Sequence, residues 1–441
     1  MAEPAPPPGD RTGGFGAALD ARLERAGTLR VAAILALFAL AVYLVSNPVR
    51  ANVYAHYVWQ ADAWLDWRFA IEWPVDEGPV RNDYYHDVVP VPGEPGRAWI
   101  PFPPLPAIVL LPAVAAFGLV TDAELIGAAI GALNAALAWI VARRVARRSS
   151  VALAAAVFFS FGTVAWVAAA RGSTWYLAHD VAITFTLLAI AAGLGRPPLG
   201  GARLLGSGFL LGVATLARLT AVLGAPFVFV TLPGPPWRRA VLAGLGLALP
   251  LAFLLTYNLA STGQLLHPAY GELYRTEEPA IPGLHHPDWF IVDPRYVPQN
   301  LAIMLLQPPR LERHCGVLPV TRTCVDDATT LTLVPDGLGM SLLLTSPGWL
   351  LALPALRRPR SGLVVGCALA VAAIALVDLM HFSQGWVQFG YRFSNDWAPF
   401  GLVLVTVALD RMGLRRAALV LIGLSVVVNL WGVYWAEVFG W

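Results

Sequence analysis

Long apolar runs separated by short polar links dominate the chain. A helix needs about 20 apolar residues to cross a bilayer, and runs near that length recur at eleven places. The predicted spans are 31–47, 123–142, 151–170, 180–195, 203–219, 220–233, 240–257, 341–356, 362–380, 397–410 and 417–436. The pattern therefore predicts an all-α polytopic membrane protein with about eleven transmembrane helices.

Arginine clusters in the links predict how the spans are oriented. The main clusters lie at 143–148, 357–360 and 411–416. By the positive-inside rule, these links and the N-terminal tail 1–30 face the cytoplasm. The clusters alternate correctly only if the proline-rich run 101–119 does not cross, so this run is expected to be a re-entrant or membrane-embedded helix on the outer side.

Four polar segments are then expected outside the cell. They are 48–100, 171–180, 258–340 and 381–396. The expected organisation is a tail 1–30, a transmembrane catalytic module 31–257 with a first outer loop 48–122, an outer loop 258–340 and C-terminal helices 341–441. Interfacial helices are expected around Trp59 and over 300–309. Cys315 and Cys324 lie nine residues apart in the third segment, where a disulfide is plausible outside the cell. The expected location is the plasma membrane.

Composition supports this class and excludes others. The chain has 441 residues, of which 57% are hydrophobic and 13% charged, which is outside the range of soluble globular domains. A net charge of +2 gives no reason to expect a nucleic-acid partner. The sequence contains no lysine, so Schiff-base and lysine-nucleophile chemistry are excluded. Motifs of nucleotide-binding and soluble hydrolytic enzymes are also missing from the sequence.

The depth of ionisable residues separates two classes of function. A transporter needs such groups near the bilayer midplane. Only Arg218 and Asp378 come close, and both lie toward the outer ends of predicted spans. The pattern favours a reaction or binding site at the outer interface. The alternatives are a transporter or flippase of a lipid-linked substrate and a noncatalytic membrane scaffold.

Acidic residues of the first outer loop are candidates for a general base. The loop contains His56 and Asp62 in "HYVWQADAWLDW" and Tyr85, His86 and Asp87 in "YYHD". A carboxylate at the membrane surface can take the proton of an acceptor hydroxyl if it lies within hydrogen-bond reach. The alternative for each acid is a solvated loop residue.

Three arginines on the outer side are candidates for a phosphate site. A guanidinium can donate two parallel hydrogen bonds to phosphate oxygens. Arg171 and Arg392 have no positive-inside role on this side, and Arg218 lies within a span. The alternatives are an Arg171–Asp180 pair, an Arg392–Asp396 pair, and an Arg218 side chain that extends to the surface.

Further polar residues of the outer segments are candidates for substrate binding. They are Tyr85, Tyr176, His179, Asp180, His267, Asn395 and Asp396. His267, His285 and His286 lack the spacing of a zinc site. No metal and no cofactor is therefore expected.

The order of these motifs resembles the membrane glycosyltransferases of the GT-C superfamily. The resemblance is carried by "HYVWQADAWLDWRF", "YYHDVV", "WIPFPPLPAIVLLP", "YLAHDVAITF", "YNLASTGQLLHPAYG", "LLLTSPGWLLALP" and "GYRFSNDWAPF". It is closest to bacterial relatives of dolichyl-phosphate-mannose:protein mannosyltransferases and to lipid A aminoarabinose transferases. The motifs are short, and their order over most of the chain carries the resemblance.

The resemblance implies a reaction and its partners. It implies transfer of a sugar from a polyprenyl-phosphate donor to a protein, glycan or lipid acceptor on the outer face, with inversion and without a metal. A first-loop Asp would be the base, and basic side chains would hold the donor phosphate. One departure is that the family's Asp-Glu after the first span is replaced by "ANVYAH", in which His56 corresponds to the histidine that follows. Asp87 is therefore the first choice for the base and Asp62 the second.

Overall fold

The computed structural model describes most of the chain. The described residues are 15–50, 54–73, 87–195, 200–232, 234–271, 286, 288–315, 329–357, 359, 361–383, 385 and 387–439. The predicted Cys315–Cys324 disulfide and the candidates Tyr85 and His86 lie outside the side chains that the structure describes.

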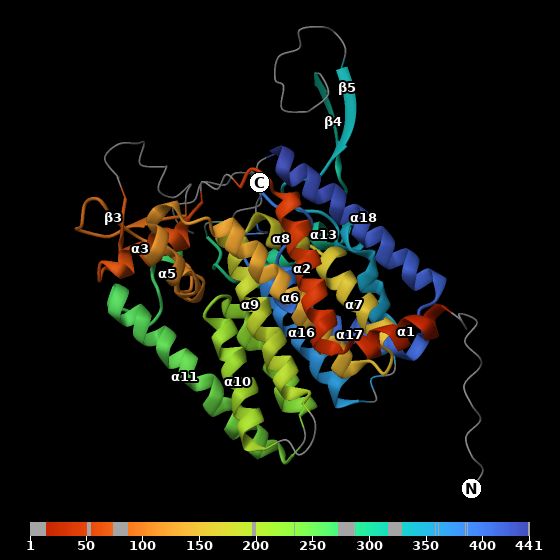
Figure 1. Cartoon of the computed structure of the whole chain (residues 1–441). Coiled ribbons are helices and arrows are strands. Elements are labelled where there is room, and N and C mark those ends of the chain that lie inside the picture. The colour runs from red at the N-terminus through yellow and green to blue at the C-terminus, as the bar shows by residue number, and fades with distance from the viewer. Residues whose placement is uncertain are drawn as a thin grey trace.

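Long helices form the body of the molecule (Figure 1). They are α1 (Phe15–Ala26), α2 (Thr28–Ser46), α6 (Ala123–Val145), α7 (Ser149–Phe161), α8 (Ala165–Arg171), α9 (Thr174–Gly193), α10 (Gly201–Thr215), α11 (Pro236–Thr262), α16 (Gly362–Met380), α17 (Ser394–Met412) and α18 (Arg416–Phe439). Shorter helical elements are α3 (His56–Leu65), α5 (Leu105–Phe117), η2 (Gly118–Val120), η3 (Leu219–Gly224), η4 (Phe227–Thr231), η5 (Pro294–Tyr296), α13 (Val297–Leu306), α14 (Leu342–Thr345), η6 (Pro347–Ala352) and α15 (Leu353–Leu356).

Several of these helices are long and apolar enough to cross a membrane. Within the described residues, six helices meet this criterion: α2, α6, α9, α11, α16 and α18. The pair α7 and α8, bent by 54°, makes a seventh if it is one span. The chain is therefore a multi-pass membrane protein. The predicted spans 203–219, 220–233 and 341–356 contain shorter apolar helices, so the count of eleven stays a prediction.

Two small antiparallel sheets correct the expectation of an all-α fold. One has the order β1–β3–β2, formed by β1 (Ile71–Glu72), β2 (Val89–Pro90) and β3 (Arg97–Trp99). The other is a hairpin of β4 (Arg310–Cys315) and β5 (Thr329–Val334). Both lie in predicted outer loops, where polar residues alternate with apolar ones as a half-buried strand requires. The chain is mostly helical, with strands confined to these loops.

The predicted outer segments meet at one end of the bundle. Trp175 of the second segment bonds to Asp87 of the first, and Tyr176 bonds to Val387 of the fourth. The third segment joins the fourth through a β-bridge between Val292 and His381. Figure 1 shows α3, β3 and the β4–β5 hairpin at this end. The expectation that these segments share one side is consistent with these contacts.

The arginine-rich links gather at the opposite end. α6 begins after Asp122, which pairs with Arg50, and ends in the turn that contains Arg143 and Arg144. Arg147 then pairs with Asp410 near the end of α17. The link at 143–148 and the end of α17 thus lie together, and their cytoplasmic orientation stays a prediction of the positive-inside rule.

The short helix α5 starts and finishes near the outer end. The backbone N–H of Leu105 donates to the carbonyl of Leu216, just past the end of α10, and Asp122 caps α6 beside Arg50. Its 13 residues extend only about 20 Å, less than the roughly 30 Å of a bilayer core. These contacts favour the predicted non-crossing helix.

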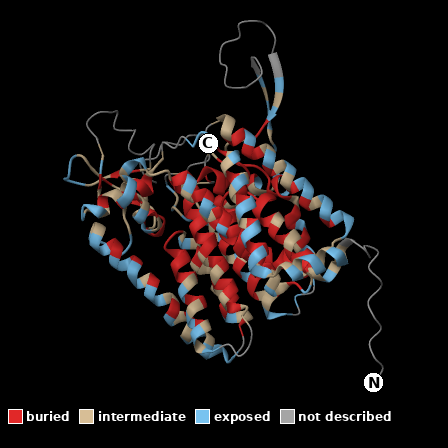
Figure 2. Cartoon of the chain, viewed as in Figure 1, coloured by how far each residue is buried: buried red, intermediate tan, exposed pale blue. Residues whose placement is uncertain are grey.

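α9 and α17 are the central helices of the bundle (Figure 2). The most apolar window of α9 is 83% buried, and most residues of α17 are buried. Small residues permit this packing, because a Cβ on Gly127 would lie 2.6 Å from the Cα of Gly172. That close approach places the first turns of α9 against α6. Both central helices carry polar side chains at their outer ends.

Candidate functional site

The first turns of α9 direct aromatic and imidazole side chains into the outer end of the bundle. Tyr176 and His179 lie three residues apart, so they share one face of the helix. Both side chains are buried. The Tyr176 hydroxyl donates to the Val387 carbonyl at 3.3 Å. This contact ties α9 to the segment that precedes α17.

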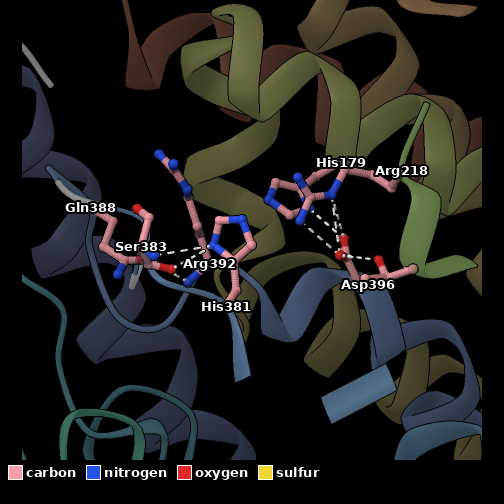
Figure 3. Close-up of polar contacts among 8 residues, drawn as sticks. His179, Arg218, His381, Ser383, Gln388, Arg392 and Asp396 are labelled. Carbon is pink, nitrogen blue, oxygen red and sulfur yellow. Dashed lines mark hydrogen bonds and ion pairs between the residues drawn. The ribbon is translucent and has the colours of Figure 1, made fainter. Parts of the chain in front are cut away.

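Asp396, in the first turn of α17, is the centre of a buried charge cluster. Arg218 donates to both of its carboxylate oxygens at 2.9 to 3.1 Å. Thr220 donates at 2.6 Å, and His179 Nδ1 lies 2.7 Å from Asp396 Oδ1. Figure 3 shows His179 and Arg218 directed at this carboxylate. The cluster is stable because the buried carboxylate has a cationic partner and several donors.

Arg392 does not form the pair with Asp396 that its spacing suggests. Arg392 precedes the start of α17 at Ser394, so the two residues are not one helical turn apart. Asp396 is already occupied by Arg218. Figure 3 shows the Arg392 guanidinium pointing in another direction. The alternative of a local Arg392–Asp396 ion pair is therefore wrong.

Arg392 is instead a buried guanidinium without a carboxylate at hydrogen-bonding distance in the described part of the chain. It is 8% exposed, and its Nε has no hydrogen-bond partner there. Its Cζ lies 5.7 Å from the ring centres of Trp175, Tyr176 and Phe393. Burial lowers the pKa of Arg392, but an arginine remains charged in proteins. The charge is stabilised by cation–π contacts with these three aromatic rings.

Asp87 also contacts Trp175. The Trp175 indole Nε1 donates to Asp87 Oδ2 at 2.9 Å. Asp87 has a φ of 54°, a left-handed conformation that aspartate tolerates better than most residues. Burial raises the pKa of Asp87 to about 6, against the opposing effects of the Trp175 hydrogen bond and the charge of Arg392. Trp175 therefore connects a carboxyl with a raised pKa to a guanidinium with no carboxylate partner.

Further buried polar atoms nearby lack partners among the described residues. They are Nε2 of His179, the hydroxyl of Tyr391, one carboxylate oxygen of Asp378 and both amide atoms of Asn395. Burial keeps the pKa of Tyr391 well above its ordinary value, so it remains a phenol. Buried polar groups are normally hydrogen-bonded. Their concentration is typical of a site that binds a polar ligand.

His381 borders the same region from the end of α16. Its Nδ1 lies 3.0 Å from the Ser383 carbonyl, and its ring packs edge-on against Phe393. Burial lowers the pKa of His381 to about 4. The ring is therefore neutral at physiological pH.

Other predicted site residues lie apart from this region. Arg171 pairs with Glu437 of α18 at 2.9 Å, not with Asp180. Asp180 is buried, and one of its carboxylate oxygens has no partner in the described part of the chain. Asp62 lies on α3 and is partly exposed. The structure thus does not bring Arg171 or Asp62 to Arg392.

Two of the histidines predicted as site residues, His56 and His267, pack against tryptophan rings. His56 is buried with Nδ1 2.8 Å from the Thr174 hydroxyl, and its ring packs against Trp175. His56 therefore stabilises the first turn of α9, which contains Thr174 and Trp175. His267 packs against Trp99, and burial lowers its pKa to about 4.

Comparisons with known proteins give one structural likeness. No protein-family model matches the chain, and no curated protein matches it. The crystal structure of ArnT from Cupriavidus metallidurans bound to undecaprenyl phosphate superimposes with a TM-score of 0.48 at 16% sequence identity. The alignment covers 88% of this chain and 61% of that one, so the chain spans less than two thirds of its length. The proposals below rest on the chain's own residues.

Several residues of the site were not predicted from the sequence. They are Trp175, Thr220, His381, Tyr391 and Gln388, whose Oε1 accepts the backbone N–H of Arg392 at 2.7 Å. Trp175 lies in the motif "RGSTWYLAHD", but tryptophan is common at membrane interfaces, so its residue type alone gave no signal. No group of three or more potential metal ligands occurs among the residues that the structure describes.

Proposed function

We propose that the chain is an integral-membrane glycosyltransferase. It would move a sugar from a polyprenyl-phosphate donor to an acceptor at the outer face of the membrane. The observation that supports this best is that Asp87 and Arg392 both contact Trp175, Asp87 through a hydrogen bond and Arg392 over the ring. A base and an anion-binding group are the two functions that such a transfer requires from the protein.

Arg392 is the group proposed to hold the donor phosphate. Of the three candidate arginines, Arg171 is matched by Glu437 and Arg218 by Asp396. Arg392 alone of the three has no ion pair within the described residues. A buried charge gains most from a partner of opposite sign, and a guanidinium fits phosphate oxygens in a bidentate manner. Phosphate binding at the membrane boundary also suits a donor with an insoluble lipid tail.

Asp87 is the proposed general base. Its carboxylate would take the proton of the acceptor hydroxyl while the hydroxyl oxygen bonds to the anomeric carbon. The bond from that carbon to the phosphate oxygen breaks in the same step, and the departing phosphate keeps the electron pair beside Arg392. Attack from the face opposite the phosphate inverts the anomeric carbon. A base with a pKa near 6 is mostly ionised at neutral pH and still accepts a proton effectively.

The depth of the polar groups favours this reading over a transporter or flippase. Among the described residues, Asp396 is the third residue of α17, and Asp378 is the third from the end of α16. His179 is the sixth residue of α9. Asp396 and Asp378 lie in the outermost turns of their helices and His179 lies in the second turn of α9, whereas a transport site is expected near the midplane. The polyprenyl-phosphate lipid partner and the independence from cofactors belong to the proposal, which names no particular sugar or acceptor class.

Transfer from a radiolabelled polyprenyl-phosphate sugar by the full chain in lipid nanodiscs tests the proposal. Asp87→Asn removes the base and should lower kcat by roughly 10²- to 10⁴-fold. Arg392→Gln should chiefly raise KM for the donor. Glu312→Gln, an exchange of the same type on the β4–β5 hairpin, should leave both constants unchanged.

Two outcomes would contradict the proposal. Full activity of Asp87→Asn would remove Asp87 from the role of base, and Asp62→Asn would then be measured as the second choice. Counterflow of intact donor across the membrane by the wild type, without any transfer product, would favour the flippase.

A further inference from the structure

A cavity of about 550 Å³ lies at the outer end of the molecule, between the three-stranded sheet and the end of α11. We call it the loop cavity. Its volume is in the range of small-molecule sites. The residues that line it include Arg68, Phe69, Glu94, Arg97, Trp99 and Thr262. None of them belongs to the site around Asp87 and Arg392.

The sheet connects the loop cavity to the proposed base. Side chains alternate along a strand, so Arg97 and Trp99 share one face of β3, and the buried Ala98 faces the other way. Val91, just past β2, also lines the cavity. Asp87 lies four residues before Val91, a distance of at most about 14 Å along the backbone. A ligand in the cavity is therefore close enough to reach Asp87.

The charges around the loop cavity do not suit an anion. Arg68 pairs with Asp66 at 2.8 Å and with Glu72 at 3.2 Å. Arg97 pairs with Glu72 at 3.4 Å. Glu94 adds a carboxylate for which no ion pair occurs within the described residues. Two guanidinium groups thus face three carboxylates, and no positive charge is left for a phosphate.

The same groups suit a ligand that is rich in hydroxyls. Guanidinium and carboxylate groups held by ion pairs still have donors and acceptors to offer. The Ser261 and Thr262 hydroxyls donate to the carbonyl of Asn258. The Thr262 oxygen also accepts from the Gln264 backbone N–H at 3.3 Å, and each hydroxyl oxygen keeps a lone pair that can accept from a ligand. Trp99 and Phe69 add aromatic rings. A sugar ring has a hydroxyl rim and C–H faces, and its C–H groups are attracted to the negative face of an aromatic ring.

The loop that forms one wall of the cavity is held in a fixed shape. The N–H of Val91 donates to the Arg97 carbonyl at 2.9 Å, and the N–H of Glu94 donates to the Val91 carbonyl at 3.1 Å. Gly93 and Gly96 have φ values of 79° and 76°, which only glycine adopts without strain. Two prolines further restrict the segment. A preformed wall loses little entropy on binding.

We propose that the loop cavity binds an uncharged, hydroxyl-rich saccharide that serves as the acceptor, or as its glycan part. The role as acceptor rests on the proposed function, while the binding of a saccharide does not. The absence of an unpaired positive charge for an anion among the described lining residues, the aromatic walls and the short distance to Asp87 carry the proposal.

Saturation-transfer difference NMR on the full chain in nanodiscs tests it. The probes are mannotriose, chitotriose and arabinotriose, with inorganic phosphate as the anionic competitor. At least one trisaccharide should bind the wild type, and phosphate should not displace it. Trp99→Leu should weaken that binding roughly tenfold, and Glu94→Gln, at an exposed position, should weaken it without affecting the fold. Trp67→Leu is the matched control, because Trp67 belongs to the same loop but is 95% exposed and outside the cavity.

The outcomes separate this proposal from the proposed function. Three results would overturn it. The wild type could bind none of the three probes, Trp99→Leu and Glu94→Gln could both bind a trisaccharide as tightly as the wild type does, or phosphate could displace the bound trisaccharide. Asp87→Asn should bind the trisaccharide as the wild type does. If that variant also keeps full transfer activity, the general-base assignment fails and the saccharide site remains. If transfer follows the expected pattern but no trisaccharide binds, the loop cavity proposal fails alone.

Discussion

Replacing Trp175 by phenylalanine removes one hydrogen bond from the proposed base and keeps an aromatic ring in place. The indole Nε1 donates to Asp87 Oδ2 at 2.9 Å. The same ring lies beside Arg392, 5.7 Å from its Cζ, and phenylalanine preserves most of that contact. A hydrogen bond to the charged form of an acid lowers its pKa. The substitution should therefore raise the pKa of Asp87 above its value of about 6.

The size of the shift follows from the strength of the bond. A hydrogen bond to a charged group contributes about 1.5 to 3 kcal/mol, and one pKa unit corresponds to about 1.4 kcal/mol. The pKa should then rise by roughly one to two units. Asp87 acts as a base only when ionised, so activity is lost as the pH falls through its pKa. With a pKa near 7.5, the ionised fraction at pH 6.5 falls from roughly three quarters to roughly one tenth.

The assay is the pH dependence of kcat/KM for sugar transfer, measured for wild type and Trp175→Phe between pH 5 and 9. The acid limb reports the pKa of the essential base in the free enzyme. Trp349→Phe is the control, because its Nε1 has no hydrogen-bond partner among the described residues and its ring packs against Phe158 in the core. That variant should keep the wild-type limb. An unchanged limb in Trp175→Phe, or one displaced to lower pH, would refute the role of this hydrogen bond.

Two further predictions concern the support of the site. Asp396→Asn removes the ion-pair partner of Arg218, whose side chain is 23% exposed, and should destabilise the protein by about 3 kcal/mol, measured as a lower thermal unfolding midpoint. Asp410→Asn breaks the pair to the exposed Arg147 side chain, while the new amide oxygen can still accept from the Arg147 backbone N–H, and should cost less than about 1 kcal/mol; equal midpoints for the two variants would contradict this. Gly385→Ala introduces a Cβ 2.9 Å from Arg392 Nε at a φ of 93°, which displaces the guanidinium. KM for the donor should therefore rise with little change in kcat, and an unchanged KM would show that Arg392 does not bind the donor.

Much of the membrane architecture follows from the sequence because it depends on local patterns. Hydropathy predicted the six helices that are long and apolar enough to cross a membrane, and the sides to which arginine placement assigns the links stay a prediction. The meeting of the four outer segments followed from the alternation of spans. The strands were missed, since β1 to β3 have two or three residues each, too few for a period-two pattern to be recognised.

The site could be predicted only as a set of candidates. Sequence spacing suggested a pair of Arg392 with Asp396, but the partner of Asp396 is Arg218, 178 residues away in the chain. Arg171 likewise pairs with Glu437, 266 residues away. Such pairings depend on which helices are neighbours, and no local pattern encodes that. Trp175 was missed for the related reason that its role depends on its contacts with both Asp87 and Arg392.

The charge of Arg392 also couples binding of the donor phosphate to the pKa of Asp87. In the free protein this charge lowers the pKa of Asp87, because it favours the carboxylate. A bound donor phosphate would neutralise much of that charge, so the pKa of Asp87 should rise in the donor complex and Asp87 should become the stronger base. The acid limb of kcat, which reports the complex, should then lie at higher pH than the limb of kcat/KM. In Arg392→Gln the acid limb of kcat/KM should move to higher pH, because the positive charge that lowers the pKa of Asp87 in the free protein is gone; an unchanged limb in this variant would show that the guanidinium and the base act independently.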